Sequence, residues 1–181
     1  GRAGVADDAA AATINVTAAG AAGPGYLTVY PCDEDRPNSS NVNYFAGTVR
    51  SNGVFAALDG QGRACIYALT TVDVIVDVNG WLPDGVFDPL PAPQRIADTR
   101  SNGETVDGGS EGGGAVGAGE VLAVGVAGRA GIDADAATAV LNVTVTDPSG
   151  PGYVTVYPCD VTRPVASNLN YAAGDVTANS V

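Results

Sequence analysis

An internal repeat constrains this chain more than any other feature of its sequence. Residues 1–54 align without a gap onto residues 128–181, and 32 of the 54 aligned positions are identical. The best-preserved run is GPGYLTVYPCD at residues 23–33, which returns as GPGYVTVYPCD at residues 150–160. The offset of 127 residues is the length of a whole domain rather than of a solenoid unit. We therefore expect a piece of a tandem array of domains.

The composition of one segment indicates a domain boundary. Residues 83–93 (PDGVFDPLPAP) are rich in Pro and Asp, which is typical of a linker. Residues 1–82 are then expected to be the C-terminal part of one repeat, and residues 94–181 the N-terminal part of the next. On this division each part is an incomplete domain. Residues 101–119, which are Gly-rich and acidic, are expected to form a mobile loop.

The pattern of apolar residues predicts short β-strands. Residues 14–17 and 141–146 alternate apolar and polar side chains, as strands with one buried face do. A Gly-Pro-Gly turn follows each and leads into predicted strands at 26–30 and 153–157. Further strands are predicted at 64–69, 72–78 and 121–126, with weaker patterns at 41–44 and 95–99. The best helical candidate, Ala9 to Ala12, is too short to stand alone.

Many short strands joined by tight turns favour an all-β fold. The expected architecture is an antiparallel β-sandwich of Greek-key type, and a β-trefoil-like barrel is the alternative, because periodicity alone does not determine topology.

Charge and composition disfavour several classes of function. With 20 acidic and 8 basic residues the net charge is −12, so binding to nucleic acid or to an anionic membrane is not expected. No apolar run approaches the roughly 18 residues of a membrane-spanning helix, so membrane insertion is not expected either. Histidine is absent, and neither a nucleophile elbow nor a Walker loop occurs. We therefore expect no enzymatic activity, no catalytic residues and no cofactor.

The chain carries a series of distinctive motifs. They are PQRIADTR at 93–100, LNVTVT at 141–146, GYxTVYPC at 25–32 and 152–159, RP…SNxNY at 36–44 and 163–171, CIY at 65–67, VIVDVNGW at 74–81 and ANSV at 178–181. In this order they resemble a tandem extracellular module of large surface and secreted proteins of actinobacteria. The resemblance covers most of the chain. It implies a secreted, extracellular or cell-surface location and a modular role, and it implies no catalytic residues.

The three cysteines are expected to behave differently. Cys32 and Cys65 are 33 residues apart within one period, and a disulfide is the usual state of such a pair in a secreted domain. It would contribute roughly 3 kcal/mol on the loop-entropy account, and two buried thiols are the alternative. Cys159 is the counterpart of Cys32, whereas the counterpart of Cys65 would fall at position 192. We therefore expect Cys159 to be unpaired within the chain or bonded to another chain.

Acidic residues offer only weak metal candidates. Asp73, Asp77 and Asn79 surround one predicted strand and carry the oxygen ligands that calcium prefers. Their spacing is not that of an EF-hand, and such residues are also typical of turns and solvated faces. Three cysteines without His or a close C-x-x-C pair do not make a zinc site. No metal site is predicted.

Repeated tyrosine and asparagine residues have two interpretations. Tyr26, Tyr30, Tyr153 and Tyr157 flank Thr residues on one face of predicted strands, where they could contact a sugar ring or cover the edge of the core. The paired Asn residues are expected to hold turns and strand edges through backbone hydrogen bonds. They are Asn41, Asn43, Asn52, Asn168, Asn170 and Asn179.

Two functional hypotheses follow. The first is a non-catalytic structural repeat of an extracellular cell-surface protein or fibre. Its incomplete parts would associate with each other or with neighbouring repeats, head to tail, by strand addition into a filament. The second is an adhesion module that binds a polysaccharide or a protein. We favour the first, because the repeated positions are strand and turn residues while the candidate contact loops differ between the copies.

Overall fold

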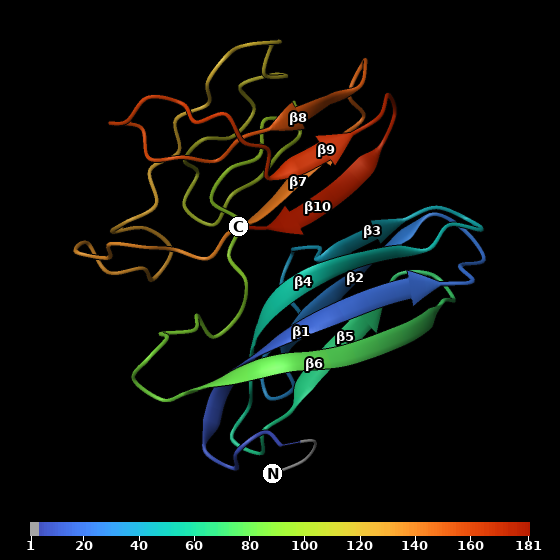
Figure 1. Cartoon of the computed structure of the whole chain (residues 1–181), viewed down its shortest axis with the longest axis vertical. Coiled ribbons are helices and arrows are strands. Elements are labelled where there is room, and N and C mark those ends of the chain that lie inside the picture. Colours follow the sequence, from blue (N-terminus) through green and yellow to red (C-terminus); the bar gives the residue numbers. More distant parts are fainter. Residues whose placement is uncertain (1–3) are drawn as a thin grey trace. The chain divides into compact units, whose positions relative to one another are not determined.

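The protein is built from β-strands and irregular segments. The computed structural model describes residues 4–181, and no helix occurs among them (Figure 1). The strands are β1 (Ala9–Ala19), β2 (Gly25–Pro31), β3 (Val42–Tyr44), β4 (Arg50–Ala57), β5 (Ala64–Ala68), β6 (Asp73–Pro83), β7 (Asn142–Thr146), β8 (Gly152–Val154), β9 (Leu169–Tyr171) and β10 (Val176–Ser180). All strand ladders are antiparallel and no sheet of the described residues closes into a barrel, so the predicted all-β sandwich class is confirmed.

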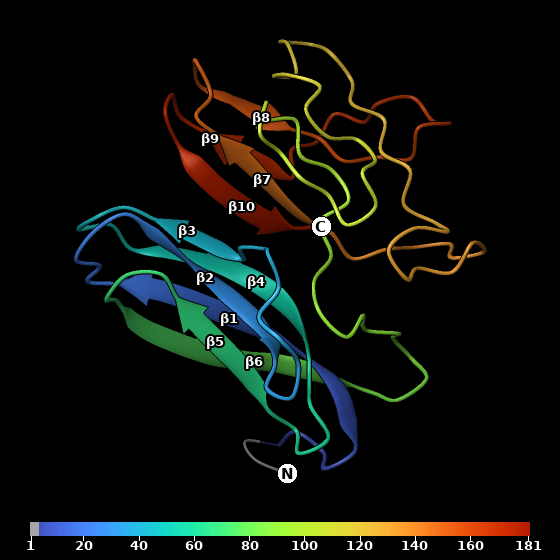
Figure 2. The same cartoon turned by 180° about the vertical axis from the view of Figure 1, so that it is seen from behind.

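Strands β1 to β6 form a two-layered sandwich. One sheet has the order β4-β1-β6, and the other has the order β3-β2-β5. The chain leaves the first sheet after β1, forms β2 and β3 in the second sheet, and returns to the first sheet with β4, which pairs with β1. Such a return to the first strand is typical of a Greek key. Strands β3 and β4 contact each other at one side of the sandwich. Strands β5 and β6 are therefore the last strands of their sheets at the opposite side (Figure 2).

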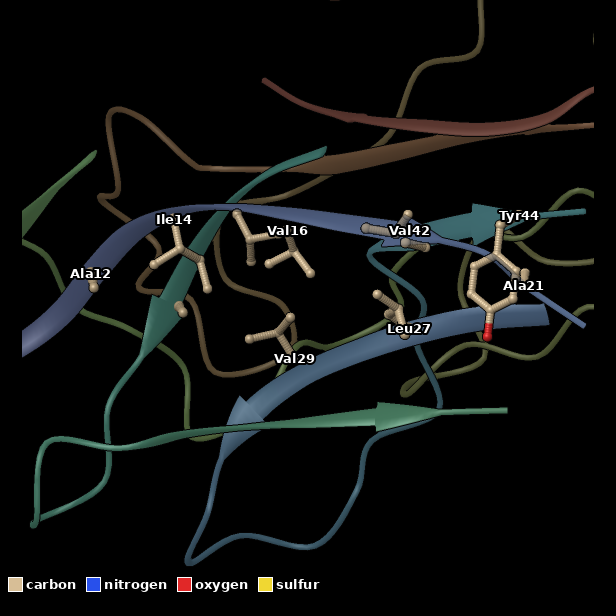
Figure 3. Packing of buried hydrophobic residues seen from close by; sticks show 11 residues of the cluster. Ala12, Ile14, Val16, Ala21, Leu27, Val29, Val42 and Tyr44 are labelled. Atoms are coloured by element: carbon tan, nitrogen blue, oxygen red, sulfur yellow. The ribbon is translucent and has the colours of Figure 1, made fainter. Parts of the chain in front are cut away.

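The core of this sandwich is made of small aliphatic side chains. From Ala12 to Ala18 every second residue of β1 is buried, which places Ile14, Val16 and Ala18 on the face that points to the other sheet. Figure 3 shows Ile14 and Val16 lying opposite Leu27 and Val29 of β2. Complete burial of each such side chain contributes about 1.5–3 kcal/mol relative to exposure, so the alternation in β1 and β2 sets the pairing of the two sheets.

One local expectation agrees with the structure and one strand prediction was wrong. Ala9 to Ala12 form no helix and are the beginning of β1, where Ala11 pairs with Ala57 on one side and with Leu82 on the other. Four alanines cannot nucleate a helix on their own, whereas two neighbouring strands satisfy their backbone groups. Residues 121–126 form no strand, because no partner strand lies beside them among the described residues.

Other boundaries differ from the predictions. Residues 95–99 contribute only an isolated bridge between Asp98 and Glu111. The predicted strand at 153–157 is shorter, because β8 ends at Val154. Strand β4 was not predicted at all, since Asn52 and Gly53 interrupt its apolar pattern. Tertiary pairing with β1 overrides their weak strand propensity.

The second copy of the repeat forms the same ladders as the first. Strand β7 pairs with β10 as β1 pairs with β4, so Val143 lies opposite Asn179 just as Val16 lies opposite Asn52. Strands β8 and β9 likewise reproduce the pairing of β2 with β3. Repeated sequence has therefore produced the same strand registers twice.

A turn conformation is also shared although its residue differs. Gly20 has a φ of +61°, in the left-handed region that glycine adopts without a steric penalty. Its counterpart Asp147 has a φ of +47°. Aspartate is among the few other residues that visit this region, because its short side chain bonds to nearby backbone. The turn after the strand is thus preserved through a substitution.

The chain divides into two compact units. The first contains the residues up to Arg36, Ser40–Ala92 and Val140–Val181, and so holds all ten strands. The second contains Pro37–Ser39 and Pro93–Ala139. This division follows spatial contacts, whereas the predicted parts 1–82, 83–93 and 94–181 follow the repeat. Residues 1–3 of the first predicted part lie outside the described residues.

Candidate functional site

The tyrosines of β2 form a cluster with residues from β5 and the following loop. Tyr26 and Thr28 lie on the face of β2 opposite the core. Tyr67 of β5 is directly opposite Thr28, and its ring centroid lies 6.1 Å from that of Tyr26. The Arg36 guanidinium carbon sits 4.3 Å from the Tyr67 ring centroid, and Arg36 Nη1 donates to Tyr26 Oη at 3.4 Å. We call Tyr26, Tyr67 and Arg36 the tyrosine–arginine cluster.

This cluster acts as a small outer layer. Thr28 is completely buried although it points away from the core, whereas Tyr26 and Tyr67 remain half-buried. The rings and the cation therefore stabilise each other while keeping an aromatic surface open to solvent. Tyr30 is also half-buried and lies on the same face of β2.

The second copy does not form a cluster of this kind. Tyr153 is 57% exposed, Tyr157 lies beyond the end of β8, and Arg163 is exposed. Tyr67 lies outside the 54 repeated residues, so the repeat supplies no second tyrosine of that kind. Repetition alone predicts that Tyr26 and Tyr30 are equivalent to Tyr153 and Tyr157, and it gives no signal for Tyr67. The predicted Cys32–Cys65 disulfide was the signal that could have placed β5 beside β2.

The disulfide is present as predicted. Cys32 and Cys65 are bonded, with a distance of 4.9 Å between their Cα atoms. The bond joins the residue after β2 to β5, whose neighbouring residues are already paired in one ladder. Cys159 is an exposed free thiol. The disulfide therefore fastens β5, and with it Tyr67, to β2 in the first copy.

Paired asparagines hold the backbone at the same places in both copies. Asn41 Oδ1 accepts a hydrogen bond from Val29 N at 2.8 Å, and Asn52 Nδ2 donates to Asn41 O at 2.8 Å. In the second copy Asn168 Oδ1 accepts from Val156 N at 2.8 Å, and Asn179 donates to Asn168 O at 2.6 Å. This finding agrees with the interpretation of these four asparagines as structural residues, whereas Asn43 Nδ2 is buried without a hydrogen-bond partner among the described residues. The hydrogen bonds of the four account for their repetition without a ligand.

The two copies meet through a polar contact. Strand β10 packs against β3 and β4 (Figure 1). Asn52 Nδ2 donates to Asn142 Oδ1 at 2.9 Å, and Ser180 N donates to Asn52 Oδ1 at 3.2 Å. Ser180 Oγ also donates to Gly53 O, so two positions related by the repeat offset touch each other. We call Asn52, Gly53, Asn142 and Ser180 the inter-copy contact.

A shallow hollow of about 250 Å³ lies beside the ends of β2 and β4. Its buried carboxylate belongs to Asp59, which accepts hydrogen bonds from Arg63 N and Nε and from Gln61 N at 2.8 to 2.9 Å. Burial raises the pKa of Asp59, but the bonds from Arg63 and Gln61 outweigh it and hold the pKa below its usual value. This carboxylate closes a loop and is not poised as a general acid.

The weak calcium candidates do not converge. Asp73, Asp77 and Asn79 are all exposed on β6. Four strand residues span about 13 Å, so Asp73 and Asp77 stand too far apart to share one calcium ion with bonds of about 2.4 Å. In the part of the chain that the structure describes, no group of three or more Asp, Glu, His or Cys could hold a metal ion.

The second unit contains two arginine–aspartate networks that the sequence analysis missed. Buried Asp98 accepts from Arg95 and Arg100, and the hydrogen bond from Arg100 is the main reason that its pKa is lowered. Asp107, within the predicted loop 101–119, accepts from Arg129 Nη2 at 2.7 Å. The hydrogen bond from Arg129 lowers the pKa of Asp107 to about 2. Within the PQRIADTR motif, Asp98 is therefore hydrogen-bonded to the side chain of Arg95 and to the backbone and side chain of Arg100.

No protein family, curated protein or solved structure matches this chain. Among the described residues there is also no helix able to span a membrane. The features of the molecule that bear on function are therefore the tyrosine–arginine cluster, the inter-copy contact and the strand edges.

Proposed function

We propose that this protein is a non-catalytic structural repeat of a secreted or cell-surface protein or fibre, and that it assembles head to tail by strand complementation. The observation that carries the proposal is the inter-copy contact, in which Ser180 donates to Gly53, the position to which the repeat relates it. One repeat is thereby joined to the next by residues that also hold each fold. Such a contact suits a tandem array, whose stability depends on the interfaces between neighbours.

The extracellular part of the proposal has two supports. A disulfide such as Cys32–Cys65 persists in oxidising compartments and is rare in the cytosol. The motif resemblance to actinobacterial surface and secreted modules points to the same location. A net charge of −12 would keep a long array soluble outside the cell.

The first experiment is to measure the particle itself. Light scattering after gel filtration, over a hundred-fold range of concentration, is expected to give masses that are multiples of 17.9 kDa. Electron microscopy of the same fractions is expected to show elongated particles, because a heterologous contact whose rotation does not close into a ring propagates into a filament. A single mass of 17.9 kDa at every concentration would refute assembly.

A second candidate function is adhesion to a polysaccharide, and the tyrosine–arginine cluster favours it. Tyr26 and Tyr67 present half-buried rings held by Arg36, and such surfaces stack on sugar rings. A Tyr26→Ala/Tyr30→Ala variant is expected to lose binding on a glycan panel. Tyr153→Ala/Tyr157→Ala is the matched control, since the second copy forms no such cluster. Absence of binding by the unaltered chain to every glycan would remove this candidate.

A further inference from the structure

The core-facing side of β6 is apolar and only partly covered. Three of its valines are directly opposite buried residues of β1: Val74 opposite Ala18, Val76 opposite Val16, and Val78 opposite Ile14. Residues directly opposite in a ladder point to the same face of a sheet. Yet Val74, Val76 and Val78 are 39%, 44% and 46% exposed. The hydrophobic core therefore continues onto β6, where these three side chains are only partly covered.

The reason lies in the facing sheet, which ends at β5. Ile66 of β5 is opposite Val29 and packs on the edge of the core, and no strand of the described residues pairs with the other edge of β5. A strand added at that free edge would lie in the layer facing β6. A strand added to the edge of β6 would leave the three valines open. One strand beside β5 is therefore the cover that this side of the sandwich requires.

Residues 121–126 (VLAVGV) have the properties of such a strand. Leu122, Val124 and Val126 occupy alternate positions with the smaller Ala123 and Gly125 between them, and as an extended strand they would span the same length as Val74 to Val78. The segment forms no ladder in the structure, and Leu122 is 47% exposed. In the repeat only Ala127 separates it from Gly128, the counterpart of Gly1, so a tandem array would carry one such segment ahead of every copy of β1.

We propose that residues 121–126 of a second copy of this chain add as a strand to the free edge of β5. Leu122, Val124 and Val126 then cover Val74, Val76 and Val78. This inference rests on the proposed assembly and names its donor and its acceptor. Donor and acceptor are different surfaces, so the contact is heterologous and leaves a donor and an acceptor free at the two ends of each dimer for further addition.

Cross-linking tests the pairing. In a Cys159→Ser background, one chain carries Val76→Cys and another carries Val124→Cys. The mixture is treated with a bismaleimide of about 10 Å span, because facing sheets pack about 10 Å apart. A covalent dimer is expected from the mixture and from neither chain alone. The control replaces Val76→Cys by Ile75→Cys, whose side chain is 53% exposed but points to the opposite face.

Each outcome has a distinct meaning. Cross-linking with Val76→Cys and not with Ile75→Cys supports the proposal. Multimers in light scattering without this cross-link would overturn it and leave the proposed assembly standing. Monomers at every concentration without the cross-link would overturn both. A chain carrying both Val76→Cys and Val124→Cys that cross-links within a monomer would show that its own segment covers β6, which overturns the second copy as occupant.

A charge placed on the donor provides an independent test. Leu122→Asp is expected to raise the dissociation constant of the multimer at least about ten-fold, because it would bury an unpaired carboxylate. Val116→Asp is the matched control, since Val116 is also 47% exposed but lies outside the donor segment. Equal effects of the two substitutions would refute residues 121–126 as the donor. Circular dichroism of each variant verifies that the fold is retained.

Discussion

The two copies of the repeat share their strand pairing but not their burial. Residues 4–54 and 128–181 form the same ladders in the same registers. Leu27 is completely buried in the first copy, whereas its counterpart Val154 is half-exposed. The first copy packs against β5 and β6, and no described strand takes that place in the second. Strand register is thus a property of the repeated residues, while a core is a property of the layers that cover them.

Truncation of matched core positions should expose this difference most strongly. Leu27→Ala is expected to lower the free energy of unfolding by about 3–4 kcal/mol, because it leaves a cavity between two sheets. Val154→Ala is expected to lower it by about 1 kcal/mol, since the partly exposed side chain buries less area. Urea unfolding measures both losses of free energy, provided that the dependence of the unfolding free energy on urea concentration is the same in each variant. Equal losses would mean that the second copy has a complete core.

Removal of cysteines should give the second-largest difference in stability between the two copies. Cys32→Ser/Cys65→Ser is expected to lower the free energy of unfolding by about 3 kcal/mol, because the unfolded chain gains conformational entropy when the cross-link is removed. Cys159→Ser, at the counterpart position, should change it by less than about 0.5 kcal/mol because this thiol is exposed. Thermal unfolding without reductant measures the pair. A large loss from Cys159→Ser would contradict its description as a free surface thiol.

The shared asparagine bonds should give a smaller contrast. Asn41→Ala is expected to cost about 2 kcal/mol, since it leaves the buried Val29 N–H without an acceptor. Asn168→Ala should cost about 1 kcal/mol or less, because water can reach the half-buried Val156 N–H. Urea midpoints compare the two. The reverse order would mean that the second copy excludes water better than its exposure indicates.

Acidification should have the smallest effect, and Asp107 of the second unit reports it most directly. The pKa of Asp107 is about 2 in the folded chain and 3.8 without its partners, so the unfolded chain takes up the proton first as pH falls. The stabilisation is present above about pH 4 and is lost as the pH falls through about 2. NMR titration of the Asp107 carboxyl carbon and of Arg129 Nε–H follows it. Asp107→Asn should remove the pH-dependent change in the Arg129 Nε–H signal. A titration midpoint near pH 3.8 for Asp107 would contradict the ion pair.

Much of the fold was predictable because it depends on local pattern. The alternation around Ile14 and Leu141 marked strands, the Gly-Pro-Gly turns marked their ends, and the spacing of Cys32 and Cys65 indicated the disulfide. The strand predicted at residues 121–126 has the same pattern but found no partner. A pattern states that a segment can pair, and only a neighbouring edge decides whether it does.

The candidate site was predictable only in part. Tyr26 and Tyr30 were identified from their repetition, but Tyr67 and Arg36 join Tyr26 through the β2–β5 ladder and the loop after β2. Asp59, Asp98 and Asp107 gave no signal in the sequence, because nothing distinguishes a paired carboxylate from a solvated one until its arginine is near.

The sequence by itself determined the repeat, the all-β class and the positions of most strands, and its spacing indicated the pairing of Cys32 with Cys65. Each follows from residue spacing, which acts over a few neighbours or within one loop. Only the tertiary structure decided that Leu27 is buried and Val154 is not, that Tyr67 completes a cluster, and that Val76 is only partly covered. Burial depends on what lies in the facing layer, and residues distant in the chain supply that layer.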